Sequence, residues 1–498
     1  MDSLKEIVKI ISKKRLDKID LIDDNMISGE DTLFSRFYLA IKNELITNDE
    51  DAVMYLYGEV NHLNQQSYRS LKSRLRSRIF NTLYFLDLNQ SNIGSNFQKI
   101  LFEQNKSVQT INILRRNGAT YSSISIIKNN FQTAVNYHLY DIAKFYAFEL
   151  AKFYAMSGKQ KLFLHYRELH EDFSQKERAI QNATLSYYQI QFYIHHSNEK
   201  KSDTDKGELL KQLISELKGY RDQAYSYDTE YFYLRSKLFL YEDTGYLEDI
   251  LDTCQEITEL SSQKQFQQPI WKGVAALYRA KALLSVSRYG EGLVELKKDI
   301  SLFNEGGLNW FTAKEYLLKL SMHQLDTEYS EVVFQEIVRN KSYKTMPEHY
   351  KQKMFIYKAY ISLMKDELVL NENKRLKLAK LFNDTLYYVN DKSGFFLSIR
   401  FLDIIESLRS GQFDAFYDKC IAVKRYMQRN LLQNNTQREQ WFIGMLTSIE
   451  TLKFQKKQIS QKNASVYERL KSNKDEILIN DYEILPYHFL WEIILRYL

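Results

Sequence analysis

Along most of the chain, apolar residues recur at spacings of three and four positions. This spacing places them on one face of an α-helix, whereas a strand would show a spacing of two. The pattern is clearest in Trp271–Ile300, where two apolar stripes lie on either side of Ser287. The stripes contain Ala276, Ala280 and Leu283 before Ser287, and Tyr289, Leu293 and Leu296 after it. The segment therefore predicts two antiparallel helices joined by a tight turn.

Turn signals recur at a nearly regular interval. Gly118 and Gly158 lie 40 residues apart, and Gly245 and Ser287 lie 42 residues apart. Gly411 follows at a distance that fits three further steps. The intervening turns are expected at polar breaks, namely 197–199, 326–327 and 371–373. A hairpin that repeats every 41 residues or so buries its apolar faces only by stacking on its neighbours, so the pattern predicts a helical-hairpin array.

The central hairpin resembles a tetratricopeptide repeat. Four positions fit the family pattern: Ala280, Tyr289, Gly292 and Leu296. Ala276 and Ser287 depart from it, and the segment 147–158 is a second, weaker match. The period of about 41 residues is nearer to the 40–47 of HEAT-type arrays than to the 34 of a strict tetratricopeptide. The resemblance implies an all-α fold, a right-handed superhelical array of antiparallel helix pairs with a concave surface that binds peptides or partner domains.

Three regions are expected from this pattern. Residues 1–96 do not follow the repeat and predict an N-terminal helical head with helices at 4–11, 32–45, 49–59 and 68–88, the last capped by Ser67. Residues 97–474 form the degenerate repeats, with early helices at 98–117, 122–137, 141–156, 159–173 and 177–196. Residues 475–498 end in an apolar helix after Pro486, which we expect to cap the last repeat or, alternatively, to dock a partner.

The fourth head helix is the most polarised stretch of the chain. Five basic residues fall within ten positions with no acid among them: Arg69, Lys72, Arg74, Arg76 and Arg78. One interpretation is a surface that binds an anionic partner, such as nucleic acid or an acidic protein. The other is a solvated helix face whose cations meet nearby acids. Further basic clusters at 374–380 and 453–474 have the same two interpretations.

Composition adds little to the functional picture. The net charge of +6 is small for 498 residues and does not require a polyanionic partner. The two cysteines, far apart in sequence, favour a reducing compartment over a disulfide framework. The N-terminus lacks the apolar core of a signal peptide, and no stretch approaches 18 apolar residues, so we expect a cytoplasmic protein without a membrane segment. The richness in Lys, Asn, Ile and Tyr is typical of an A/T-rich genome, and we expect a bacterial source.

Three classes of function follow. A non-catalytic scaffold would bind a protein or peptide on the array, with Tyr146, Tyr154, Tyr231 and Tyr278 as candidate contacts. A nucleic-acid-associated regulator would combine the basic head helix with a ligand-sensing array, as do some bacterial regulators that this layout resembles. An enzyme is disfavoured because no nucleophile, phosphate-loop, dinucleotide or zinc motif is found. His165 and His170 lie five positions apart, which places them on different helix faces, so we expect no metal or cofactor. The oligomeric state stays open.

Overall fold

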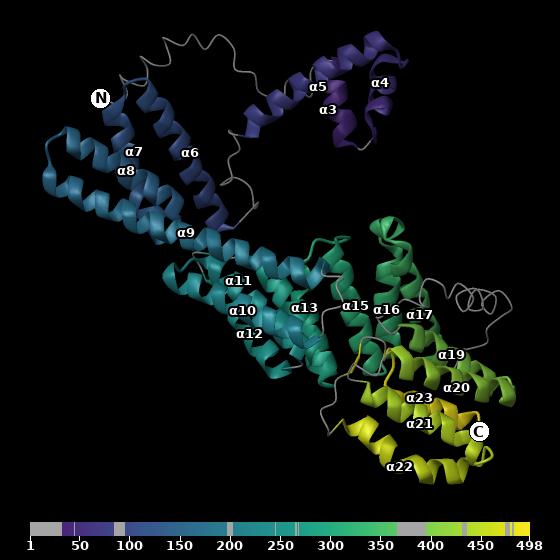
Figure 1. Cartoon of the computed structure of the whole chain (residues 1–498). Coiled ribbons are helices and arrows are strands. Elements are labelled where there is room, and N and C mark those ends of the chain that lie inside the picture. The colour runs from purple at the N-terminus through teal and green to yellow at the C-terminus, as the bar shows by residue number, and fades with distance from the viewer. Residues whose placement is uncertain are drawn as a thin grey trace. The chain divides into compact units, whose positions relative to one another are not determined.

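The computed structural model describes residues 32–43, 45–83, 95–196, 203–244, 246–263, 266, 268–365, 395–430, 436–473, 479–480 and 483–498. Over these residues the chain forms twenty α-helices and two short 3-10 helices, and no strand occurs among them (Figure 1). The predicted all-α class is therefore confirmed. Most contacts between helices join neighbours in the chain, which is consistent with a helical repeat array.

The chain divides into two compact units. The first is built mainly from residues up to Asn182, and the second mainly from residues after it. The expected helix at 4–11, the breaks at 245 and 371–373 and the basic cluster at 374–380 lie outside the described residues.

The head, residues 32–83, consists of three helices, α3 (Leu33–Lys42), α4 (Asp49–Tyr57) and α5 (His62–Leu83). The side chains of Thr32 and Asn48 accept hydrogen bonds from backbone N–H groups in the first turns of α3 and α4, so both residues act as N-caps. A small core forms where Phe37 packs edge-on against Tyr68, with ring centres 5.4 Å apart, beside Leu71 of α5. Three of the helices expected in the head are thus present.

Helix α5 begins earlier than the sequence pattern predicted. The side-chain oxygen of Asn61 accepts a hydrogen bond from the N–H of Asn64 at 2.8 Å, which is the geometry of an N-cap. Ser67, the predicted cap, therefore lies inside the helix, and that prediction was wrong. Both residue types are good caps, and only the path of the chain after Gly58 decides which one begins the helix.

The first hairpins comprise α6 (Asn96–Arg116), α7 (Thr120–Asn136), α8 (Tyr140–Met156) and α9 (Gln160–His196). Two helices expected at 159–173 and 177–196 are in fact one continuous helix of 37 residues. Between them lies no Gly or Pro, and the hydroxyl of Ser174 donates to the carbonyl of His170 one turn back. The polar residues there are therefore accommodated on the helix surface and do not end it.

The second unit continues with the later helices. They are α10 (Asp203–Gln223), α11 (Tyr227–Thr244), α12 (Leu247–Ser262), α13 (Pro269–Ser285), α14 (Tyr289–Asp299), α15 (Leu308–His323), α16 (Thr327–Arg339), α17 (Glu348–Met364), α19 (Phe395–Arg409), α20 (Phe413–Asn430), α21 (Gln437–Thr451), α22 (Lys456–Ser472) and α23 (Tyr487–Arg496). Each proline stands at or just before the first residue of a helix, as expected.

Six turns between consecutive helices use one backbone device. One residue adopts a positive φ, and the following N–H bonds to the carbonyl five residues earlier, as in a Schellman turn. Glycine supplies that residue at 118, 158 and 411, but His138, Ser287 and Leu325 do so elsewhere, with φ of 56°, 65° and 59°. The turn at 138 agrees with the break predicted between the helices at 122–137 and 141–156, although no glycine marks it.

Two contacts between alternate helices have separations close to the predicted repeat length. The hydroxyl of Tyr146 on α8 donates to Gln104 on α6 at 3.1 Å, and that of Tyr357 on α17 donates to Glu315 on α15 at 2.9 Å. Both pairs are 42 residues apart. These separations agree with the predicted step of about 41 residues.

The central hairpin α13–α14 is closely packed where the sequence suggested. A Cβ added to Gly292 would lie 3.0 Å from the Cδ2 atom of Leu320 and 3.3 Å from the Cβ of Leu283. Ala280 and Leu296 are nearly fully buried. The small residue at 292 thus permits α14 to approach both its partner helix and the next hairpin.

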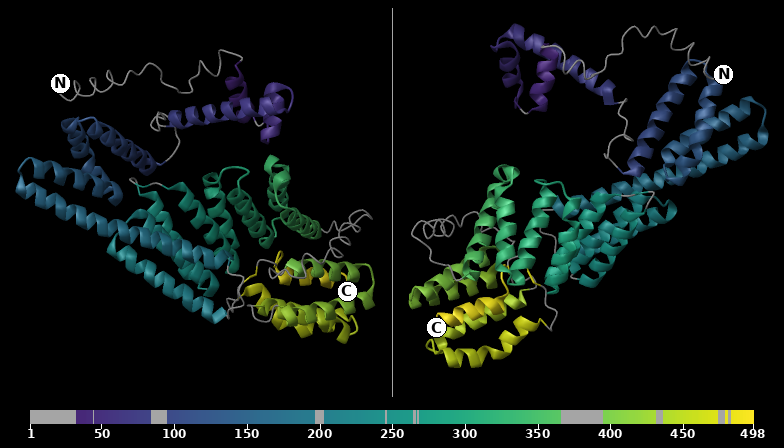
Figure 2. Two further views of the ribbon diagram at one scale, coloured as in Figure 1. Left: turned by 45° about the horizontal axis from the view of Figure 1, so that its top comes forward. Right: turned by 180° about the vertical axis from the view of Figure 1, so that it is seen from behind.

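The C-terminal segment returns to the central hairpin. Helix α23 lies beside the last helices of its unit (Figure 2). It buries Leu490, Ile493 and Ile494 there. Before it, the carboxylate of Glu483 receives two hydrogen bonds of 2.7 and 2.8 Å from the guanidinium of Arg438, and both side chains are almost completely buried. His323 at the end of α15 donates from Nε2 to the Glu483 carbonyl at 2.7 Å.

Candidate functional site

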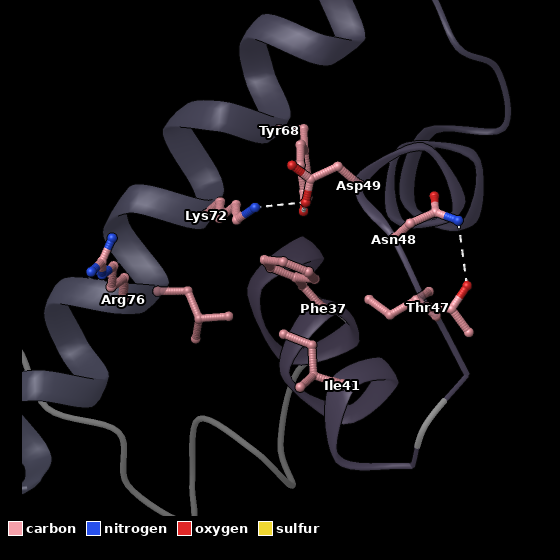
Figure 3. Close-up of a pocket in the computed structure, with 10 residues that line it drawn as sticks. Phe37, Ile41, Thr47, Asn48, Asp49, Tyr68, Lys72 and Arg76 are labelled. Atoms are coloured by element: carbon pink, nitrogen blue, oxygen red, sulfur yellow. Dashed lines mark hydrogen bonds and ion pairs between the residues drawn. The ribbon is translucent and has the colours of Figure 1, made fainter. Parts of the chain in front are cut away.

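The best-defined concave feature of the head is a groove of about 460 Å³ between α3, α4 and α5 (Figure 3). We call it the head groove, and it is lined by Phe37, Ile41, Ile46, Thr47, Asn48, Asp49, Tyr68, Lys72, Leu75 and Arg76. Its floor is apolar because α3 and α5 each carry apolar residues spaced three or four positions apart, and these two stripes face each other. Ile41 remains 49% exposed, and neighbouring Leu45 is 58% exposed. Both exposures are high for large aliphatic side chains next to a core.

One wall of the groove is polar and internally connected. The carboxylate of Asp49 accepts hydrogen bonds from Lys72 Nζ at 2.6 Å and from the Tyr68 hydroxyl at 2.8 Å (Figure 3). The hydrogen bond from Lys72, and to a smaller extent the one from Tyr68, lowers the pKa of Asp49. This carboxylate is therefore ionised at neutral pH. Burial, and to a smaller extent the hydrogen bond to Asp49, raises the pKa of Tyr68. Its phenol therefore stays protonated.

The loop before α4 is held in place by a second carboxylate. Asp51 accepts hydrogen bonds from the N–H of Thr47 at 3.2 Å and from the side-chain amide of Asn48 at 3.0 Å. The hydroxyl of Thr47 also donates to this carboxylate. Together these side-chain hydrogen bonds tie the loop that carries Thr47 and Asn48 to the first turn of α4.

The five basic residues of α5 do not form one surface. Lys72 and Arg76 lie on the groove, one turn apart. Arg78 is half-buried, with its guanidinium 4.6 Å from the ring centre of Phe34. Arg69 and Arg74 are exposed. The predicted cationic patch is therefore divided between a groove-lining pair, an aromatic contact and a solvated remainder.

The four tyrosines expected on a peptide-binding surface occupy different environments. Tyr146 is fully buried, and burial raises its pKa to about 12. Tyr154 and Tyr231 are 7% exposed, the former stacked on Tyr166 and the latter on Trp271 at a ring distance of 3.9 Å. These three side chains therefore fill the spaces between helices.

Tyr278 belongs to a different cluster, which joins alternate helices of the second unit. The guanidinium of Arg235 on α11 lies 4.3 Å from the ring centre of Tyr278 on α13 and 4.4 Å from that of Phe239. Tyr278 is half-buried, whereas the other three candidate tyrosines are buried.

The remaining candidates give no further site. The described cations of the 453–474 cluster lie on or beside α22, where Arg469 stacks 4.0 Å from the ring centre of Trp441. Among the described residues, no group of three His, Cys, Asp or Glu side chains has a geometry suited to a metal ion. None of the described helices is both long and apolar enough to cross a bilayer.

The head groove was only partly foreseen. Lys72 and Arg76 were identified by their charge, but Phe37, Ile41 and the 46–49 loop were not. The sequence did contain the acidic first turn of α4 and the basic helix α5, which together indicate an ion pair. They do not reveal the groove beside that pair. Comparisons with family models, curated proteins and solved structures found no match to this chain.

Proposed function

We propose that this protein is a non-catalytic binding protein whose head groove holds an apolar, acid-flanked segment of a partner protein, while the hairpin array serves as a scaffold. The observation that carries the proposal is the combination of a preformed apolar floor with Lys72 and Arg76 on one rim. An aliphatic or aromatic side chain of the partner would contact Ile41 and Ile46. An adjacent carboxylate would meet the guanidinium of Arg76.

The expected affinity follows from these two contacts. Burying one aliphatic side chain contributes about 1.5–3 kcal/mol, and a charge-assisted hydrogen bond contributes about 1.5–3 kcal/mol. Together they correspond to weak binding once the cost of association is included. We therefore expect the partner also to cover the exposed side chains of Ile41 and Leu45, which extend the apolar surface beyond the groove.

The test compares charge reversals on the same helix. Tagged full-length protein is used to capture partners from its native extract, with wild type, Arg76→Glu and Ile41→Asp in parallel. Arg74→Glu is the matched control, since Arg74 is an exposed arginine of α5 that does not line the groove. A protein retained by wild type and Arg74→Glu but lost from the other two supports the proposal. Equal retention by all four would refute it.

A second candidate is a nucleic-acid-associated regulator. The exposure of Arg69 and Arg74 on α5 favours it, because free guanidinium groups contact phosphates without any groove. In that case nuclease treatment would remove the captured material, and Arg74→Glu would weaken binding as much as Arg76→Glu. Binding to duplex DNA or RNA would also weaken steeply as salt increases.

A further inference from the structure

The guanidinium of Arg235 on α11 is held by aromatic rings. Its central carbon lies 4.3 Å from the ring centre of Tyr278 and 4.4 Å from that of Phe239. Its Nη1 atom is buried and has no hydrogen-bond partner among the residues that the structure describes. A buried charge is normally paired or hydrogen-bonded, because removing it from water costs free energy. Arg235 therefore calls for an explanation.

Neighbouring cations do have acidic partners. Lys237, two residues further along α11, forms an ion pair with Glu256 at 3.3 Å. Arg279 of α13 forms one with Glu295 at 2.7 Å. Arg235 is thus a departure from the charge pairing around it, and it does not reflect a general lack of acids in this part of the chain.

Two tyrosines place neutral hydrogen-bond donors beside this guanidinium. Tyr187 of α9 stacks on Phe232 of α11 with ring centres 4.4 Å apart, and Tyr278 comes from α13. Burial raises the pKa of both phenols against the smaller, opposing effect of the Arg235 charge, so both stay protonated. Tyr187, Arg235 and Tyr278 are each half-buried and belong to the second unit. We call these three residues the Arg235 site.

The helices that supply the site offer Arg235 no acid. Residues 181–196 of α9 and the whole of α13 contain no Asp or Glu. On α11 itself, the positions three and four residues from Arg235 are all apolar or aromatic, so no acid lies one turn away. The next acid on the C-terminal side, Glu242, forms an ion pair with Lys281. These helices therefore leave the positive charge of the site uncompensated.

We propose that the Arg235 site binds an oxyanion, the carboxylate or phosphate group of a ligand. A guanidinium holds such a group through two parallel N–H donors. Only Nη1 is enclosed without a partner, so Nε and Nη2 remain for this contact. The rings hold the guanidinium in place, which lowers the entropy cost of binding. The hydroxyls of Tyr187 and Tyr278 would donate to the remaining oxygens. The site is independent of the head groove, since the two belong to different units.

Line broadening of two probe ions in NMR spectra tests the proposal. Inorganic phosphate is observed by phosphorus NMR and trifluoroacetate by fluorine NMR, each with full-length protein at constant ionic strength. We expect at least one probe to bind with a dissociation constant on the order of 1 mM, as fits two charge-assisted hydrogen bonds. The probe that binds more tightly shows whether the ligand carries a phosphate or a carboxylate.

Charge variants locate the binding. Arg235→Gln should abolish the saturable broadening. Lys237→Gln is the matched control, because Lys237 carries the same charge on the same helix but is paired with Glu256. It should bind the probes like the wild type. Arg76→Glu, which alters only the head groove, should also bind them like the wild type, so the two sites can fail separately.

A conservative variant tests the hydroxyls while leaving the aromatic packing intact. Combining Tyr187→Phe with Tyr278→Phe keeps both rings, and we expect about tenfold weaker binding. The proposal is overturned if neither probe binds to the wild type, or if Arg235→Gln binds as strongly as the wild type. It is also overturned if Lys237→Gln loses as much binding as Arg235→Gln, or if the double phenylalanine variant binds with unchanged affinity.

Discussion

The buried carboxyl of Glu439 makes the stability of the second unit depend on pH. Its Oε1 atom accepts hydrogen bonds from the Asn480 side chain at 3.2 Å and the Tyr487 hydroxyl at 3.3 Å. Its Oε2 atom is buried without a hydrogen-bond partner. Burial, followed by the nearby charge of Glu483, raises the pKa of Glu439 to about 7. Although burial opposes ionisation of Glu483, the guanidinium of Arg438 lowers the pKa of that carboxyl.

The sign of the pH effect follows from these directions. Glu439 has an ordinary pKa of 4.5, and its folded-state pKa is higher, so the folded protein holds this proton more tightly than the unfolded chain does. The stability that the proton contributes is complete below pH 4.5 and is lost as the pH rises through about 7. The difference between the two pKa values corresponds to about 3 kcal/mol.

Substitution of Glu439 by Gln should remove this dependence. Glutamine has the shape of the protonated acid, keeps an oxygen for Asn480 and Tyr487, and cannot ionise. We therefore expect the variant to exceed the free energy of unfolding of the wild type by less than about 1 kcal/mol near pH 5 and by about 3 kcal/mol near pH 8.5.

Urea denaturation followed by tryptophan fluorescence measures this difference in the right part of the molecule. All four tryptophans, at positions 271, 310, 441 and 491, lie in the second unit. Glu208→Gln, an exposed substitution on α10, is the control and should leave stability unchanged at both pH values. A variant that gains nothing between pH 5 and 8.5, or that is less stable at both, would refute the reasoning about the buried carboxyl.

Three further predictions concern the same fold. Arg438→Ala leaves a buried carboxylate without its cation and should lower the free energy of unfolding by about 3–5 kcal/mol in the same denaturation assay; a loss below 1 kcal/mol or so would contradict the buried pair. Gly292→Val places a side chain where a Cβ already lies 3.0 Å from a leucine, so it should cost about 1–3 kcal/mol, whereas an unchanged midpoint would show that α14 can move away. Burial raises the pKa of Cys254 and Cys420 to about 12, so neither should react with Ellman's reagent at pH 8 until urea unfolds the protein; rapid reaction in native buffer would contradict their burial.

The sequence by itself determined the helical class and predicted a repeat step of about 41 residues. Spacings of three and four residues arise within each helix, so they need no knowledge of neighbours. Glycines at 118, 158 and 411 marked turns because their positive φ is cheap for glycine. The break at His138 was predicted from the helix pattern alone, although there a non-glycine residue adopts the positive φ. Polar residues near Ser174 suggested a break that the long helix α9 does not contain, because these residues lie on its surface.

The candidate sites depended on tertiary structure. Charge identified Lys72 and Arg76, but only the packing of α3 and α4 against α5 places them on an apolar groove and turns Arg78 toward Phe34. The pairing of Arg438 with Glu483 joins residues 45 positions apart, and no periodic pattern records such a contact. Likewise, Tyr187 and Tyr188 are adjacent in sequence, yet one is stacked inside and the other is exposed. Local periodicity defines the faces of a helix, but which faces are covered is decided by the elements that pack on them.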